Sequence, residues 1–418
     1  MDFPLTRPPL RSPNTRLPSS SPPAHLHRPP PPVRVSCRGG SGTGDDAAVR
    51  TVRTVTISHS ELKDKGRDLS AKIEEGFGPN GLGILSVSDI PGYISLRRDL
   101  LHLSPRLANL PEELMKEMED PESRYNFGWS HGKEKLESGK LDTLKGSFYA
   151  NPIFDVPTSD VSLMQRYPSY CRPNIWPNDA LPKLEQAFKM LGRLMLDVGL
   201  MLAYHCDRYV FKKMAKSDDE GLESILLRSR CHKGRLLYYF PRQRSSSEDV
   251  PSLSSWCGWH TDHGSITGLT CGMFLRDAIE IACPDSTAGL YIKTRNDDIV
   301  KVVFQENEIA YQIGETTEIL SSGLLCATPH CVQAPKGEKA LGVERSTFAL
   351  FMQPDWIFQL GDPYYFIFFV FRSLFLQMAL LHLESILRCS STSITICDHN
   401  LSETGLQEDP ILSIPACR

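Results

Sequence analysis

Two histidines and one aspartate combine residue types that bind transition metals. His260 and Asp262 stand two residues apart, and on a β-strand residues at this spacing point to the same face. A third candidate, His330, follows much later in the chain. Two neutral imidazoles and one carboxylate can hold Fe(II) and leave its other coordination positions open for dioxygen and a co-substrate. The same ligand types suit zinc, so the residues alone leave an iron site and a zinc site open.

A third histidine lies beside this pair but is not expected to bind the metal. His263 directly follows Asp262. Because neighbouring residues on a strand point to opposite faces, we predict that the two side chains diverge and that His263 is not a ligand.

A cation and a hydroxyl follow His330, at Arg345 and Thr347. A guanidinium can meet a carboxylate with two parallel charge-assisted hydrogen bonds, which the ammonium of a lysine cannot do. An arginine buried in a sheet without a partner is costly, and alternation turns the neighbouring Glu344 to the other face. Arg345 is therefore a candidate for binding a carboxylate of a ligand. The alternatives are a surface salt bridge at Arg345 and an ordinary β-forming role for Thr347.

Short β-prone runs surround these residues after Arg235. They recur between turn residues, which favours a sandwich or a jelly roll. The runs cover 236–240, 268–271, 289–292, 300–303, 310–313 and 348–352. Apolar residues also recur at steps of three and four from Leu184 to Leu202, which predicts a long amphipathic helix packed against the sheet.

The N-terminal part of the chain mixes strand and helix patterns. The patterns predict strands at 54–57 and 83–87, a serine-capped helix at 60–75 and one or two helices over 100–119. Residues 124–157 carry glycines and aromatic residues without a clear period. We predict that this stretch is irregular.

The composition excludes several classes of protein. The 418 residues carry a formal net charge of −4, which offers no basic surface for nucleic acid. The 12 cysteines contain no C-x-x-C pair, so neither a zinc ribbon nor a redox pair is indicated, and a disulfide framework is not expected in so long a chain. We therefore predict a protein that binds no nucleic acid and whose cysteines are mostly buried reduced thiols.

The first 50 residues differ from the rest. They hold seven arginines, eleven prolines, no lysine and, before Asp45, a single acidic residue, Asp2. Such a segment cannot bury enough apolar surface to fold, and an N-terminus rich in Arg and Ser and poor in acids is typical of an organellar transit peptide. We predict that residues 1–50 direct the chain to the chloroplast stroma. The alternative is a disordered proline-rich tail on a cytoplasmic protein.

The last part of the chain is also atypical. An apolar run interrupted by Arg372 covers 364–387 and is followed by a polar end. An arginine at the centre of a membrane span costs about 2.5–3.5 kcal/mol on insertion scales. We therefore predict a tail over 357–418 that packs on the protein or is an atypical chain end. Association with a membrane, if there is any, is expected only through 364–387.

Several of these motifs together resemble a known family. The motifs are His260-Thr261-Asp262, Gly289-Leu290-Tyr291-Ile292, Ile313-Gly314-Glu315-Thr316-Thr317-Glu318, His330 and Arg345-Ser346-Thr347. In this order they resemble the C-terminal half of plant 2-oxoglutarate and Fe(II)-dependent dioxygenases of the isopenicillin N synthase-like type. The match covers about residues 226–356, and residues 52–205 are similar more loosely.

The resemblance implies a role for each matching residue. His260, Asp262 and His330 would hold Fe(II). Arg345 would pair with the distal carboxylate of 2-oxoglutarate, and Thr347, where the family has serine, would add a second hydrogen bond. The Arg-x-Thr pattern argues against the zinc hydrolase that the metal ligands alone would permit.

One departure from the family concerns the strand before the metal motif. Relatives carry Asn-x-Tyr followed by proline, whereas here Tyr238 stands at the Asn position and Phe240 at the Tyr position. The resemblance thus implies that Tyr238 contacts the co-substrate. It also implies that Phe240 lacks a hydroxyl with which relatives bind that co-substrate.

The resemblance finally implies a fold and an activity. The fold is a mainly β double-stranded β-helix, a jelly roll, flanked by N-terminal helices. The activity is hydroxylation or desaturation of a small organic metabolite with 2-oxoglutarate and O2 as co-substrates and release of succinate and CO2. We expect a monomer with a transit segment (1–50), an N-terminal region (51–225), a jelly roll (226–356) and a tail (357–418). A non-catalytic binding protein that retains the fold is the alternative to an enzyme.

Overall fold

The computed structural model describes residues 49–356, except 135–138, 140, 215–219 and 242–254, and the statements below concern these residues. They all belong to the second of two units, which begins at Val49. Nearly all of the predicted transit segment, and the whole predicted tail with its run at 364–387, lie outside the described residues. Among the described helices, none has the length and apolar character that crossing a bilayer requires.

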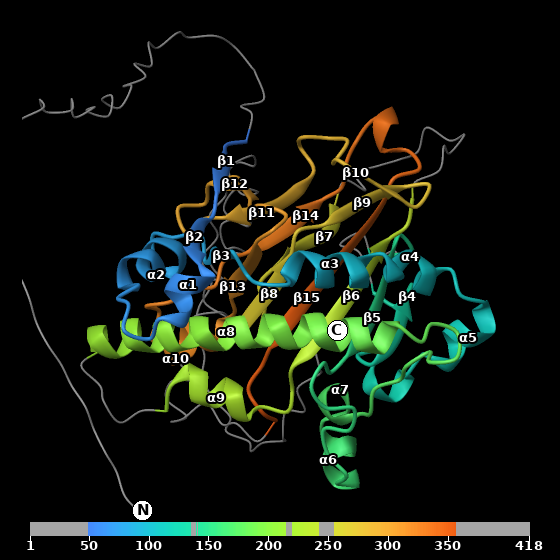
Figure 1. The fold of residues 1–418 in the computed structure, drawn as a ribbon, viewed down its shortest axis with the longest axis horizontal. Helices are drawn as coiled ribbons and strands as arrows, with labels where there is room; N and C mark the ends of the chain where they lie inside the picture. Colours follow the sequence, from blue (N-terminus) through green and yellow to red (C-terminus); the bar gives the residue numbers. More distant parts are fainter. Residues whose placement is uncertain (1–48, 135–138, 140, 215–219, 242–254, 357–418) are drawn as a thin grey trace, which may run out of the picture. The chain divides into compact units, whose positions relative to one another are not determined.

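The larger of two sheets carries most of the strands (Figure 1). Its order is β2 (Val55–Ser58), β3 (Ile84–Ser88), β13 (Ile309–Ile313), β8 (Ile266–Thr270), β15 (Glu344–Met352), β6 (Lys233–Tyr239), β5 (Lys145–Ala150) and β4 (Gly128–His131). Two short strands, β9 (Met273–Arg276) and β10 (Ile279–Ile281), extend it beside β15. Strands from both sides of the predicted boundary at 225 and 226 therefore share one sheet.

The smaller sheet has five strands. Its order is β1 (Thr51–Arg53), β12 (Ile299–Val303), β11 (Gly289–Lys293), β14 (His330–Gln333) and β7 (Ser255–His260). Apolar side chains of the two sheets pack against each other, as Ala310 of the large sheet does with Ile292 and Val302 of the small one. Two mainly antiparallel sheets that pack face to face form a jelly roll. The predicted fold class is confirmed.

The other face of the large sheet is covered by one long helix, α8 (Leu184–Met214) (Figure 1). Its stripe of apolar residues, which includes Phe188 and Met195, is buried in the largest core cluster. Gly199 permits the close approach, because a Cβ there would lie 2.4 Å from Sδ of Met352 on β15. The predicted amphipathic helix is present and extends twelve residues beyond Leu202 to Met214.

Shorter helices surround the sheets, and several of them pack against α8. They are α1 (His59–Lys63), α2 (Ser70–Phe77), α3 (Tyr93–Leu101), α4 (Leu103–Ala108), α5 (Glu112–Glu117), η1 (Pro121–Ser123), α6 (Val161–Arg166), α7 (Pro168–Cys171), α9 (Leu222–Arg228), α10 (Glu315–Leu320) and η2 (Glu338–Ala340). Two predictions are wrong here. The stretch 124–157 is not irregular, because it contains β4 and the fully buried β5. The single helix predicted over 60–75 is two helices.

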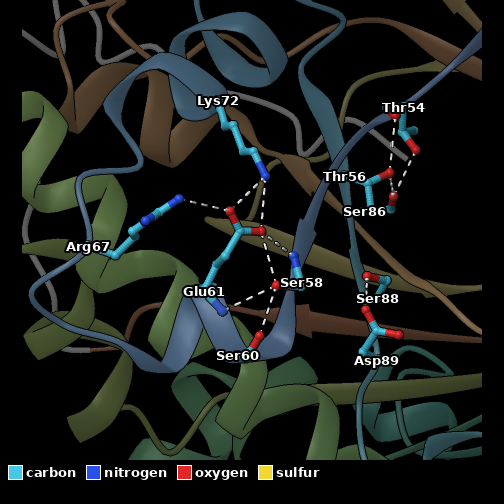
Figure 2. A network of polar contacts seen from close by, with 10 residues as sticks. All are labelled: Thr54, Thr56, Ser58, Ser60, Glu61, Arg67, Lys72, Ser86, Ser88 and Asp89. Atoms are coloured by element: carbon cyan, nitrogen blue, oxygen red, sulfur yellow. Dashed lines mark hydrogen bonds and ion pairs between the residues drawn. The ribbon is translucent and has the colours of Figure 1, made fainter. Parts of the chain in front are cut away.

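Figure 2 shows why the first of these helices begins where it does. Ser58, not the predicted Ser60, is the N-cap: its hydroxyl accepts a hydrogen bond from N of Glu61, and the Glu61 carboxylate accepts one from N of Ser58. This reciprocal pair is a capping box. The backbone bond from Ser58 and the ion pair with Lys72 of α2 lower the pKa of Glu61 to about 2. The carboxylate thereby joins two helices that the sequence pattern merges into one.

Candidate metal centre

The structure brings the three predicted metal ligands together between two strands of the small sheet. His260 is the last residue of β7 and His330 the first of the adjacent β14, where the two are register partners. Asp262 lies just beyond the end of β7. One ligand atom from each residue lies within 4.8 Å of the others, and Nε2 of His260 is 3.8 Å from Oδ1 of Asp262. Side chains at these distances can share one metal ion.

Hydrogen bonds orient two of these side chains. Nδ1 of His260 lies 2.8 Å from the carbonyl oxygen of Gly258, so Nδ1 keeps its proton in the neutral ring and Nε2 is the nitrogen that can bind a metal. The hydroxyl of Thr267 donates to Oδ2 of Asp262 over 2.6 Å, which leaves Oδ1 for the metal. Outer hydrogen bonds of this kind set the tautomer and the angle of metal ligands.

His330 is held by a different partner. Its Nδ1 is 3.2 Å from the carbonyl of Thr328 and 2.7 Å from Nε2 of Gln312. Metal binding through Nε2 requires a proton on Nδ1 and therefore acceptors around it. Oε1 of Gln312 is buried and makes no hydrogen bond with a described residue, and a half turn of the amide exchanges this oxygen with the nitrogen. Gln312 can thus accept the proton of the metal-binding tautomer of His330.

Gln312→Leu is expected to weaken Fe(II) binding by about 10- to 100-fold, which is the usual effect of losing an outer partner of a metal ligand. Gln312→Glu keeps an acceptor next to Nδ1 and should bind Fe(II) far more tightly than the leucine variant. Anaerobic titration with Fe(II) measures both affinities, and thermal melting monitors the fold. Equal Fe(II) affinities in wild type and Gln312→Leu would show that Gln312 does not support His330.

The two imidazoles differ in their protonation before a metal binds. Burial lowers the pKa of His260, but contacts with Cys257, the carbonyl of Gly258 and Asp262 outweigh it, and the pKa is raised to about 9. Burial lowers the pKa of His330. At neutral pH a metal must therefore displace a proton from His260, and its affinity rises with pH up to about 9.

His263 lies outside this cluster, as predicted. Its imidazole is 90% exposed, and its Nδ1 is 2.5 Å from Oε2 of Glu315 at the start of α10.

The three predicted metal ligands line a cavity between the two sheets. The cavity has a volume of about 320 Å3 and is lined by His260, Asp262 and His330 together with Arg345 and Thr347. Its walls are mainly apolar, with residues such as Leu237, Leu269, Leu290, Val302, Phe304 and Val332. The predicted co-substrate residues on β15 therefore face the same space as the predicted metal ligands.

Arg345 lacks a carboxylate partner among the described residues. Its guanidinium lies 5.0 Å from the ring centre of Tyr239 and 5.2 Å from that of Trp256. Nη1 is buried without a hydrogen-bond acceptor in the described part of the chain. A buried donor of a charged group without an acceptor is costly. The residues present therefore fit a ligand that brings a carboxylate to Arg345 and binds the metal with its other end.

Gly272 keeps space for this guanidinium. A Cβ at Gly272 would lie 2.5 Å from Nε and 2.9 Å from Cζ of Arg345. Gly272→Ala is therefore expected to displace the guanidinium and to weaken 2-oxoglutarate binding at least about tenfold, the loss of one charge-assisted hydrogen bond, with Fe(II) affinity unchanged. Isothermal titration under anaerobic conditions measures both. Gly66→Ala, in a surface turn, is the control, and unchanged 2-oxoglutarate affinity in Gly272→Ala would contradict the prediction.

Thr347 lies beside Arg345 on the cavity side of β15. Its hydroxyl donates to the carbonyl of Thr270 over 3.2 Å. The hydroxyl must turn from this carbonyl to donate to a ligand in the cavity.

The structure does not bring Tyr238 into the cavity. Tyr238 is the register partner of Ser346 and packs with its ring 4.8 Å from that of Phe240, on the opposite face of β6. Tyr239 instead pairs with Arg345 and lines the cavity. Antiparallel partners share a face, and an offset of one residue exchanges the faces. The expectation that Tyr238 faces the co-substrate site is therefore wrong, and Tyr239 is the tyrosine of β6 that faces the cavity.

Phe240 is also outside the cavity, since its ring stacks on His131 at 4.8 Å. A tyrosine at this position would not add a hydroxyl to the site. Tyr239 lies opposite Arg345 and Leu237 opposite Thr347, and this register, which no local sequence signal gives, decides which face of β6 lines the cavity.

Comparisons with known proteins relate the fold to other structures. No family model matches the chain, and no curated protein does. A full-length Neurospora crassa protein in complex with alpha-KG is 21% identical, with a TM-score of 0.53 over 72% of this chain and 84% of that one. A 2OG-Fe(II) oxygenase family protein from Caulobacter crescentus is 17% identical, with a TM-score of 0.53 over 72% of this chain and 86% of that one. The chain shares the fold of these proteins. At these identities the similarity concerns the fold alone.

Proposed function

We propose that this chain is a dioxygenase that depends on Fe(II) and 2-oxoglutarate and hydroxylates or desaturates a small organic metabolite. The observation that carries the proposal is one cavity lined by His260, Asp262 and His330 and by Arg345, whose buried Nη1 has no acceptor among the described residues. The fold shared with a protein crystallised with alpha-KG and with a 2OG-Fe(II) oxygenase family protein supports it. The narrower assignment to the plant isopenicillin N synthase-like group rests on the sequence motifs.

The proposed reaction consumes 2-oxoglutarate and O2. One oxygen atom enters succinate as 2-oxoglutarate loses CO2, and the other enters the product or leaves as water when the substrate is desaturated. Bound Fe(II) supplies the oxidising chemistry. The protein residues hold the metal, orient the 2-oxoglutarate carboxylate at Arg345 and surround the reacting groups with apolar side chains.

A hydrolase with zinc at the same ligands has less support. Such an enzyme needs the metal and a water molecule, and it leaves the donors of Arg345 without a function. The arginine and the metal ligands in one cavity therefore favour the oxygenase.

The test is turnover by the purified protein. Incubation with Fe(II), 2-oxoglutarate and a plastid metabolite extract in air should release succinate. It should also produce a compound that is heavier by one oxygen or lighter by two hydrogens. Asp262→Ala is the inactive control. Tight 2-oxoglutarate binding without succinate release would favour a binding protein that retains the fold.

We further propose that residues 1–50 direct the chain to plastids, because they are rich in Arg, Ser and Pro and nearly free of acids. A fluorescent protein fused behind this segment is expected to accumulate in chloroplasts of leaf cells. The same fusion with the seven arginines replaced by glutamate is the control and should remain in the cytosol. Cytosolic fluorescence of the unaltered fusion would exclude the transit role and favour a cytoplasmic enzyme.

A further inference from the structure

The cavity contains a second arginine that neither the metal nor 2-oxoglutarate requires. Arg235 lies on β6 and lines the cavity. It is the register partner of Ala349, whereas Tyr239, opposite Arg345, is four residues further along the strand. That separation corresponds to roughly 13 Å along a β-strand. A group bound by Arg235 is therefore distinct from the carboxylate bound by Arg345.

Arg235 is also close to the level of the metal ligands along the sheet. Its partner Ala349 pairs in turn with Leu269 of β8. Two residues before Leu269, Thr267 donates its hydroxyl to Asp262. A ligand that contacts Arg235 therefore lies close to the predicted metal along the strand direction. The reacting carbon of a substrate must also lie near the metal.

Two of the three guanidinium nitrogens of Arg235 make hydrogen bonds to described protein groups outside the cavity lining, and the third does not. Nε and Nη2 donate to Oγ of Ser147 over 3.0 and 2.8 Å, and Nη2 donates to Oε1 of Glu134 over 2.5 Å. The remaining nitrogen, Nη1, makes no hydrogen bond with a described residue, and neither Ser147 nor Glu134 lines the cavity. The side chain is 15% exposed. Two N–H donors of a fixed cation are thus left for a ligand.

The other charges of the cavity favour a negative ligand. Asp262, a predicted metal ligand, supplies the one carboxylate among the lining residues that the structure describes. The formal charges of Fe(II), Asp262, Arg345 and doubly negative 2-oxoglutarate cancel. Lys301 on β12 lines the cavity as a further cation, so the described lining carries three cations, Arg235, Arg345 and Lys301, against the one carboxylate of Asp262, and the Glu134 carboxylate that pairs with Arg235 lies outside the lining.

We propose that Arg235 binds a carboxylate of the primary substrate, which makes that substrate a small, largely apolar carboxylic acid. The apolar walls contact its body, and the free edge of the guanidinium makes charge-assisted hydrogen bonds with its carboxylate. The substrate is small because the cavity of about 320 Å3 also has to accommodate 2-oxoglutarate. The inference rests on the proposed dioxygenase function and specifies its substrate class.

The test compares acids with their neutral esters. Phenylacetate, 3-phenylpropionate and octanoate, each beside its methyl ester, are titrated by calorimetry into the protein with Fe(II) and 2-oxoglutarate in the absence of oxygen. At least one acid is expected to bind tenfold or more tightly than its ester and to increase succinate release in air. If no acid binds more tightly than its ester, the proposal is overturned.

Variants of Arg235 test whether this residue causes the preference for acids over esters. Arg235→Gln should abolish the difference between acid and ester and change 2-oxoglutarate affinity less than twofold. Because this variant leaves Glu134 without its partner, the double variant Arg235→Gln with Glu134→Gln is included and should behave in the same way. Arg230→Gln is the matched control, since Arg230 also pairs with an acid, Asp355, but does not line the cavity. An acid preference retained in both Arg235 variants would overturn the proposal.

Binding of 2-oxoglutarate distinguishes failure of the proposed function from failure of the Arg235 assignment. If wild-type protein does not bind 2-oxoglutarate, the dioxygenase assignment is wrong. If it binds 2-oxoglutarate and acids have no advantage over esters, only the assignment of Arg235 is wrong.

Discussion

Alanine at Asp262 or His330 should abolish tight Fe(II) binding while the protein remains folded. Each change removes one of three protein ligands and is expected to lower Fe(II) affinity by more than about 100-fold, since loss of an outer partner alone costs about 10- to 100-fold. The fold should persist because both side chains line a cavity, where truncation creates no new void in packed core. Metal analysis after dialysis and thermal melting are the measurements.

His263→Ala is the matched control for the metal-site variants. His263 is adjacent to Asp262, yet it is almost fully exposed and pairs with Glu315. The variant should retain iron at the wild-type stoichiometry. Iron retained at that stoichiometry in His330→Ala would instead mean that the third ligand is another residue.

Arg345→Lys should weaken 2-oxoglutarate binding about 10- to 100-fold, because a hydrogen bond to a charged group contributes about 1.5–3 kcal/mol and a lysine cannot make the paired bonds of a guanidinium. Fe(II) affinity should change little, because the positive charge is kept and no metal ligand is altered. Anaerobic calorimetry with the Fe(II) protein measures 2-oxoglutarate affinity directly.

Arg276→Lys provides the control for the arginine variant. Arg276 ends β9 near the same edge of the sheet, but its guanidinium donates to the carbonyl of Lys339 and does not line the cavity. Its 2-oxoglutarate affinity should equal that of wild type. If Arg345→Lys also binds like wild type, Arg345 does not hold the co-substrate.

The three candidate metal ligands were identified from a short local pattern at His260 and Asp262 and from the order of motifs that adds His330. The two-residue spacing placed His260 and Asp262 on one face and the same alternation excluded His263, whereas in the structure β7 ends at His260 and both Asp262 and His263 lie beyond it. The meeting of His330 with His260 is long-range, yet the order of motifs along the chain indicated it. The regularly spaced short strands indicated a sandwich or a jelly roll, and the family resemblance specified the jelly roll.

The errors arose where long-range pairing determines the structure. Tyr238 and Tyr239 are indistinguishable by type, and only the register of β6 with β15 decides which one faces the cavity. The buried strand β5 carries Lys145, Gly146 and Ser147, which have low strand propensity. Pairing with β6 and the ion pair of Lys145 with Glu134 compensate for this low strand propensity. Neither compensation is visible in a local window of sequence.

The sharing of one sheet by the two halves of the sequence limits how the chain can be divided. A fragment that begins at residue 226 would lack β3 and β5, which flank β13 and β6. Those two strands carry Gln312 and Arg235 and would become open edges, which invite pairing with other chains. The isolated C-terminal half should therefore aggregate and lose the support of His330. The N-terminal half therefore covers two strands of the large sheet that would otherwise be exposed edges beside the cavity.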